Sequence, residues 1–185
     1  MIPIALAPAA AMAIAGRGEA ALRRLSALQA GKACKVLLFS DQPEALLARK
    51  AGRFLRRRLP HQSDLAGLNV LWITGLPDDR AAELAALARS ERVLVNVEDR
   101  PELCDFHSVA EVRRGDLLLT VSTGGASPGL AARIRARLAD QYGPEWADRT
   151  ALVGRHRRSW RDGRRTPAEV AALTDALLQA NGWLT

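Results

Sequence analysis

Two closely spaced glycines near the N-terminus could hold a phosphate group. Gly16, Gly18 and Ala21 have the G-x-G-x-x-G/A spacing of dinucleotide-binding turns, after an apolar run and before a helical pattern. In this interpretation Gly16 allows the sharp turn out of a strand, and Gly18 lets the main chain approach a pyrophosphate closely. The free N–H groups and the positive dipole at the start of the helix then bind the phosphates. The candidate cofactor-binding residues here are Gly16, Arg17, Gly18, Glu19 and Ala20; the alternative is a strand–turn–helix unit without a ligand.

A carboxylate follows the next apolar run. Asp41 comes after residues 35–39 and lies 23 residues beyond Gly18, near the spacing of about 20 at which dinucleotide folds place a ribose-binding acid. Such an acid accepts hydrogen bonds from ribose hydroxyls and repels a 2′-phosphate, which favours NAD over NADP. The sequence leaves open the alternative that Asp41 caps a helix beginning near Pro43. Gly75, at the end of another apolar run, is a further candidate cofactor-binding residue.

The elements that position these residues alternate between apolar runs and helical patterns. Continuous apolar runs are typical of strands covered on both faces, and strand–helix alternation is typical of parallel sheets with right-handed crossovers. The expected fold class is α/β: a Rossmann-like parallel-sheet domain, then a small α+β domain and a helical tail. Expected strands cover residues 10–15, 35–39, 54–59, 68–75 and 93–97, with an edge strand or lead-in at 2–6, and expected helices cover 19–30, 44–52 and 77–89.

The pattern changes after Asp99. Two alternating runs, residues 107–113 and 117–123, flank a Gly-Asp turn, which predicts a β-hairpin. A glycine-rich loop follows, and a helix is expected to begin at Ser127 with Pro128 in its first position. Two more helices are expected over residues 144–160 and 167–183. The organisation we predict is therefore a dinucleotide-binding domain at 1–105, a hairpin-plus-helix dimerisation domain at 106–142, and a helical region at 143–185.

The composition limits the classes of function. The chain has 185 residues, 48% of them hydrophobic, and a formal net charge of +7, which predicts a packed core and an anionic partner. Its two cysteines, Cys34 in an expected strand and Cys104 in a loop, predict neither a zinc site nor a disulfide scaffold. The apolar N-terminus lacks the charged start of a secretory signal and is too short to span a bilayer, so we expect a cytoplasmic protein. The arginine-rich residues 155–165 leave nucleic-acid binding as an alternative, which the 4% aromatic content disfavours.

Two motifs later in the chain identify a family. Residues 96–101 read N-V-E-D-R-P and are followed by Phe106, and residues 122–131 read S-T-G-G-A-S-P-G-L-A. Together with the glycine turn at residues 16–24, they resemble the precorrin-2 dehydrogenase / sirohydrochlorin ferrochelatase family, the N-terminal module of siroheme synthase. The resemblance covers residues 1–142, and the last helices match only in type.

The resemblance implies a homodimeric enzyme that uses NAD to oxidise precorrin-2 to sirohydrochlorin and that, in bifunctional members, inserts Fe²⁺. It implies that Asp99 is the catalytic carboxylate, placed after a parallel strand beside the nicotinamide to accept a proton; the alternative is an ordinary loop acid. The implied substrate-binding residues are Asn96, Ser122, Thr123, Gly124, Gly125 and Ser127. The tetrapyrrole carries eight carboxylates, which suits a basic protein rich in arginine.

Three departures from the family pattern leave another hypothesis open. Arg17 stands where the family commonly has glycine, and Arg24 stands where lysine is usual. The usual P-K-x-A-S-F reads P-E-L-C-D-F at residues 101–106, which replaces a basic loop with an acidic one. A relative that binds NAD or a tetrapyrrole without turnover is therefore the alternative to a dehydrogenase.

Overall fold

The computed structural model describes residues 5–33 and 35–184. The chain forms two compact units, one ending at Ser108 and one beginning at Val109. The edge strand expected at residues 2–6 lies mostly outside the described residues, and so does Cys34. The further boundary expected near residue 142 stays a prediction. Within the described ranges, no helix is long and apolar enough to cross a membrane.

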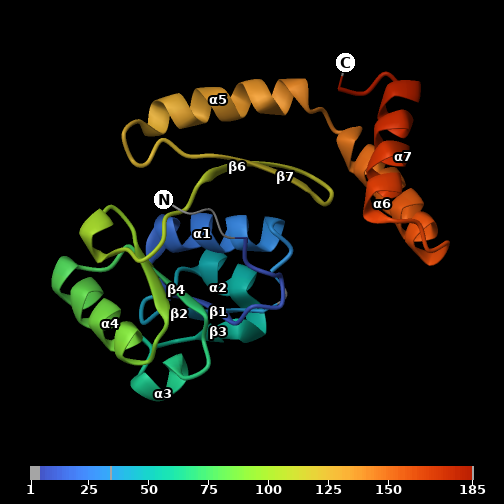
Figure 1. Ribbon diagram of the computed structural model, residues 1–185. Coiled ribbons are helices and arrows are strands. Elements are labelled where there is room, and N and C mark those ends of the chain that lie inside the picture. Colours follow the sequence, from blue (N-terminus) through green and yellow to red (C-terminus); the bar gives the residue numbers. More distant parts are fainter. Residues whose placement is uncertain (1–4, 34, 185) are drawn as a thin grey trace. The chain divides into compact units, whose positions relative to one another are not determined.

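The first unit is built on a five-stranded parallel sheet in the order β3-β2-β1-β4-β5 (Figure 1). This sheet confirms the expected α/β class. The expected strand at 54–59 is shorter than predicted, because Gly52–Phe54 form a 3-10 turn and only two residues then pair with β2. The strands are β1 (Met12–Gly16), β2 (Val36–Phe39), β3 (Leu55–Arg56), β4 (Val70–Thr74) and β5 (Leu94–Val97).

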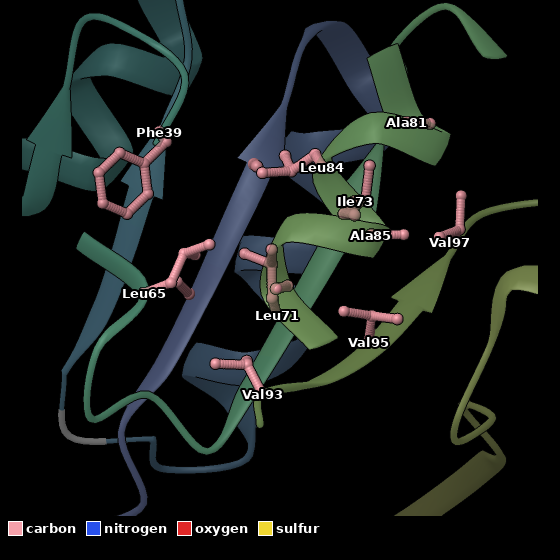
Figure 2. Close-up of a cluster of buried hydrophobic side chains, with 13 residues drawn as sticks. Phe39, Leu65, Leu71, Ile73, Ala81, Leu84, Ala85, Val93, Val95 and Val97 are labelled. Carbon is pink, nitrogen blue, oxygen red and sulfur yellow. The ribbon is translucent and has the colours of Figure 1, made fainter. Parts of the chain in front are cut away.

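Helices cover both faces of this sheet, as the apolar character of its strands requires. On one face α1 (Gly18–Ala30) and α2 (Ala45–Ala51) bury Leu25 and Leu47 against the strands. On the other face, α3 (Gln62–Leu65) and α4 (Asp78–Ser90) pack on a second cluster of apolar side chains (Figure 2). The short α3 was not expected from the sequence. Side chains labelled in Figure 2 from this cluster include Phe39, Leu65, Leu71, Ile73, Leu84 and Val95.

The parallel pairing decides where the candidate site lies. Carboxyl ends of parallel strands share one edge of a sheet, where ligands of doubly wound folds bind. At this edge Gly18 follows β1, Asp41 follows β2, Gly75 follows β4 and Asp99 follows β5. Four stretches separated in sequence are thus brought to one edge by the parallel pairing of the strands.

The second unit contains the expected hairpin and three helices (Figure 1). The antiparallel strands β6 (Ala110–Arg114) and β7 (Leu117–Val121) turn at Gly115. Ser127 caps the helix α5 (Pro128–Gln141), and Pro128 is its first residue, which confirms the predicted helix start. The helices α6 (Trp146–Asp162) and α7 (Pro167–Ala180) pack against each other.

Candidate functional site

The glycine turn lies between β1 and α1, and its two glycines have different tasks. Gly18 has φ +62°, a left-handed conformation that favours glycine, so it makes the turn. Gly16 is the last residue of β1, and a Cβ there would lie 2.3 Å from the Thr74 carbonyl oxygen. The prediction that Gly16 makes the sharp turn is therefore wrong. Gly16 allows β1 to pack closely against β4, and Gly18 makes the turn. Ala21 is fully buried, as expected of the residue that packs the helix on the sheet.

Gly75 closes the other side of the turn. It has φ +61°, and a Cβ on it would lie 2.6 Å from the carbonyl oxygen of Arg17. The main-chain N–H of Arg17 donates to the Thr74 carbonyl at 3.2 Å. The turn after β1 and the end of β4 are thus held together by direct contact between their main chains.

The start of α1 fits an anionic ligand. Its first hydrogen bond to a main-chain carbonyl runs from Ala21 N to Arg17 O at 3.4 Å, and no side chain caps the helix. The N–H groups of Gly18, Glu19 and Ala20 precede that bond and are the donors that a phosphate uses at a helix N-terminus. Two buried hydroxyls at the same edge of the sheet, Ser40 Oγ and Thr74 Oγ1, have no hydrogen-bond partner among the described residues. These features fit a dinucleotide.

Glu19 and Ala20 differ in their surroundings. The Glu19 side chain is exposed and lies 3.6 Å from Arg23, one helical turn later. Ala20 lines a shallow pocket of about 190 Å³ together with Arg23, Arg24, Ala27 and Glu98. Glu19 therefore presents a solvated charge, whereas Ala20 lines a pocket between α1 and Glu98. Cofactor contacts of both residues stay predictions.

Asp41 is held by Arg17. The guanidinium donates from Nε to Oδ1 at 2.8 Å and from Nη2 to Oδ2 at 2.6 Å. This bidentate contact lowers the pKa of Asp41 and raises that of Arg17. The N-cap of α2 is Glu44, so the alternative that Asp41 caps this helix is wrong. The sequence did not reveal the pair, because Arg17 and Asp41 meet only through the register of β1 and β2.

Asp99 lies in the turn after β5. Its side chain is exposed, and its φ of +59° is left-handed, a conformation that aspartate adopts more readily than most residues other than glycine. In the part of the chain that the structure describes, its carboxylate has no hydrogen-bond or ion-pair partner. The neighbouring Glu98 is engaged instead: its carboxylate lies 3.5 Å from Arg23. Of the two adjacent acids, Asp99 is the one without an ion-pair partner among the described residues, and its catalytic role stays a prediction.

Asn96 anchors the segment that follows this turn. The residue is 7% exposed, and its Nδ2 donates to the Phe106 carbonyl at 2.9 Å. The Cys104 sulfur accepts from the main-chain N–H of Val97 at 3.2 Å, and Asp105 accepts from that of Val95 at 2.9 Å. Residues 104–106 are therefore tied back to β5, an arrangement that explains the buried polar Asn96. A substrate contact of Asn96 stays a prediction.

Arg24 is a residue whose surroundings the sequence did not reveal. Burial lowers the pKa of its guanidinium, while the nearby Glu98 opposes that shift. Its Nη1 donates to Ser108 Oγ at 2.8 Å, and the guanidinium lies 5.9 Å from the centre of the Trp72 ring. Its buried Nε has no hydrogen-bond partner among the described residues. The sequence singled out Arg24 only as a departure from the family pattern and did not indicate these contacts.

The glycine-rich loop belongs to the second unit. Thr123 Oγ1 accepts from Ser127 N at 3.0 Å and donates to Ser127 O at 3.1 Å, and Ser127 Oγ accepts from Leu130 N at 3.2 Å. Ser122 Oγ accepts from Gly124 N at 3.2 Å. Gly124 and Gly125 have φ +64° and +89°, and a Cβ on either would meet nothing within 4 Å. Hydroxyl groups therefore hold the loop's conformation through hydrogen bonds to its main chain, and no atom of the described residues packs over its two glycines.

Comparison with known proteins agrees with this arrangement. The family model for NAD(P)-binding matches residues 8–110, more than half of the chain. This chain belongs to that NAD(P)-binding family. The family model for the central part of sirohaem biosynthesis proteins matches residues 114–141. Together these matches confirm the resemblance drawn from the motifs.

Relatives of this NAD(P)-binding chain are siroheme synthases. That of Methylococcus capsulatus is 41% identical over 131 residues, which are 68% of this chain and 27% of the relative. That of Pseudomonas entomophila is 35% identical over 148 residues, 78% of this chain and 32% of the relative. The chain thus spans about a third of these relatives. Among solved structures, SirC, a precorrin-2 dehydrogenase, shares the fold with a TM-score of 0.77 at 19% identity, over 96% of this chain and 89% of that one.

Proposed function

We propose that this chain is an NAD-dependent dehydrogenase that oxidises precorrin-2 to sirohydrochlorin in siroheme biosynthesis. One observation carries the proposal: the glycine turn and Asp99 follow strands β1 and β5, which flank β4 in a single parallel sheet. A dinucleotide-binding turn and an unpaired acid thus share one edge of the sheet. Precorrin-2 is the proposed substrate because the structural neighbour SirC is a precorrin-2 dehydrogenase and the relatives are siroheme synthases.

The residues of this edge divide the work of the reaction. Oxidation of the macrocycle removes a hydride and a proton from precorrin-2. Bound NAD⁺ supplies the hydride acceptor. Gly16, Gly18 and Gly75 shape the cradle, and the N–H groups at the start of α1 bind the diphosphate. Asp99 takes the proton, a task that suits an exposed carboxylate without an ion-pair partner among the described residues.

The loop of the second unit is the proposed contact for substrate carboxylates. A carboxylate accepts hydrogen bonds from main-chain N–H and hydroxyl groups. In this loop the Gly125 N–H has no hydrogen-bond partner among the described residues, and the Ser127 hydroxyl, which accepts from Leu130 N, keeps its own hydrogen to donate. Gly124 and Gly125 leave its main chain uncovered, since their Cα atoms face open space. Arginines of the same unit, Arg133, Arg135 and Arg137 among them, add positive charge for a polyanionic substrate.

The proposal includes a homodimer in the cytoplasm. Leu130 and Ile134 lie one turn apart on α5 and are 51% and 40% exposed. Large exposed side chains on one helix face are typical of a contact surface between proteins. Light scattering should give twice the chain mass, and Ile134→Asp should shift it to that of one chain; a monomeric wild type would contradict this part of the proposal.

Insertion of Fe²⁺ into sirohydrochlorin is the second candidate activity. It is favoured by the same exposed Asp99, because metal insertion requires a base for the pyrrole N–H protons. Anaerobic incubation with sirohydrochlorin and Fe²⁺ tests it through the absorbance of siroheme. A rate equal to that without protein would contradict it.

The decisive experiment follows NADH formation from precorrin-2 and NAD⁺ under anaerobic conditions. Asp99→Asn removes the base, and asparagine tolerates the positive φ, so the variant should stay folded. We expect turnover to fall by about 100-fold or more with unchanged NAD⁺ binding, whereas the matched variant Glu98→Gln should stay within about tenfold of wild type. Full turnover of Asp99→Asn would contradict the assigned role. A wild-type chain that binds NAD⁺ without turnover would instead favour a silent relative.

A further inference from the structure

The ion pair between Arg17 and Asp41 is fixed by strand register. β1 and β2 pair with Met12 opposite Val36 and Ala15 opposite Phe39, an offset of 24 residues. The same offset places Arg17 opposite Asp41 just beyond the strands, and their side chains meet in two hydrogen bonds of 2.8 and 2.6 Å. The side chains are 27% and 34% exposed, so the pair lies at the surface of the candidate site and is open to a ligand.

This pair changes what the acid after β2 can do. In a dinucleotide fold this acid accepts hydrogen bonds from the ribose hydroxyls and repels a 2′-phosphate, whereas a nearby arginine accommodates that phosphate. Here both carboxylate oxygens of Asp41 are bound to Arg17, which neutralises the charge that would repel a phosphate. The selection for NAD that Asp41 alone would impose is therefore weakened.

The guanidinium also keeps donors for an anion. Its bonds to Asp41 use Nε and Nη2, while Nη1 has no hydrogen-bond partner in the described residues. Arginine suits this task because it stays charged and binds phosphate through paired donors. The carboxylate of Glu44 opposes binding of an anion here. Its Oε1 atom lies beside the same turn, 3.7 Å from the position that a Cβ on Gly18 would take.

We propose that Arg17 is a specificity-determining residue that lets this chain bind NADP⁺ as well as NAD⁺, by contacting the 2′-phosphate. The inference deepens the proposed function, since it rests on a dinucleotide at the same turn. Glycine at this position would leave Asp41 without this partner and the site selective for NAD⁺.

Isothermal titration of the intact chain with each dinucleotide tests the inference without any tetrapyrrole. Arg17→Gly should weaken NADP⁺ binding by about tenfold or more, the worth of a lost hydrogen bond to a charged group. It should not weaken NAD⁺ binding, because it frees Asp41 for the ribose hydroxyls. Asp41→Asn removes the competing carboxylate and should tighten NADP⁺ binding. The matched control is Arg92→Gly: Arg92 is exposed, precedes β5 at the opposite edge of the sheet, and has φ +61°, which suits glycine. It should alter neither affinity.

The outcomes separate this inference from the proposed function. Equal loss of NAD⁺ and NADP⁺ affinity in Arg17→Gly would overturn it, because Arg17 would then bind the shared part of the two molecules or only hold the turn. Wild-type binding of NAD⁺ alone would also overturn it, even if precorrin-2 is oxidised. Arg17-dependent binding of NADP⁺ without turnover of precorrin-2 would uphold it and contradict the proposed function.

Discussion

The glycine turn after β1 and the glycine-rich loop before α5 are similar in sequence but differ in structure. At Gly16 and Gly75 a Cβ would lie 2.3 and 2.6 Å from main-chain oxygens, so neighbouring main chain demands glycine there. At Gly124 and Gly125 a Cβ would meet nothing within 4 Å, and only the positive φ favours glycine. The turn in the first unit is fixed by packing on the sheet, whereas the loop in the other unit is fixed by its own hydroxyl groups. A short glycine-rich motif therefore does not reveal by itself whether a ligand or a neighbouring strand requires the glycine.

Alanine at one glycine of each region gives the largest expected difference. Gly16→Ala forces a Cβ into the Thr74 carbonyl and should cost about 3 kcal/mol or more of unfolding free energy, or prevent folding. Gly124→Ala meets open space and should cost only about 1 kcal/mol, through its left-handed backbone. Urea unfolding followed by circular dichroism measures both. Equal losses would show that the Thr74 carbonyl can move aside and that packing of β1 on β4 does not require glycine at position 16.

Asn96 ties the segment after β5 to the first unit through its bond to the Phe106 carbonyl. Replacing Asn96 therefore tests how much this bond stabilises the unit. Asn96→Ala leaves the partly buried Phe106 carbonyl without its donor and should cost about 1–3 kcal/mol of stability. The matched variant Asn69→Ala removes an exposed acceptor for Ala11 N and should cost less. A raised KM for precorrin-2 with unchanged stability would instead assign Asn96 to the substrate.

The elements were predictable where one stretch of sequence decides them. Leu94–Val97 form a strand, as the apolar run at residues 93–97 predicts, although Leu94 is exposed. Ser127 with Pro128 begins a helix because both act on adjacent main chain. The parallel class followed from alternation alone. These interactions are local, so the sequence carries them without knowledge of the fold.

The contacts of the site were less predictable because they depend on register and crossing chains. The need for glycine at position 16 comes from Thr74, which only the pairing of β1 with β4 brings near. The Arg17–Asp41 pair likewise needs the register of β1 and β2. Arg24 is half-buried because Trp72 and Ser108 meet it from distant parts of the chain. Residue types indicated a dinucleotide site, but the partners of each side chain required the sheet.

The loop of the second unit should respond to loss of one hydroxyl. Ser127→Ala removes the N-cap of α5 and should cost about 1 kcal/mol. The matched variant Thr166→Ala removes the N-cap of α7 and should lose a similar amount. If the loop binds substrate, only Ser127→Ala should also weaken sirohydrochlorin binding, measured by fluorescence titration. Equal binding by both variants would contradict a substrate role for this loop.

The smallest expected effect is a pH dependence of stability. It distinguishes the Arg17–Asp41 ion pair of the first unit from the hydroxyl groups that hold the loop of the second unit. The bond from Arg17 lowers the pKa of Asp41 in the folded chain, so the pair adds stability above the ordinary carboxyl pKa of about 4 and loses it as the pH falls through the lowered value. Because both side chains are about a third exposed, Asp41→Asn should cost under about 1 kcal/mol at neutral pH. The difference from wild type should vanish in acid and shrink in salt. Since a serine hydroxyl does not titrate there, the loss in Ser127→Ala should be the same across that range. A pH-independent loss in Asp41→Asn would mean that the carboxylate acts through shape and hydrogen bonding alone, as the hydroxyls of the second unit do.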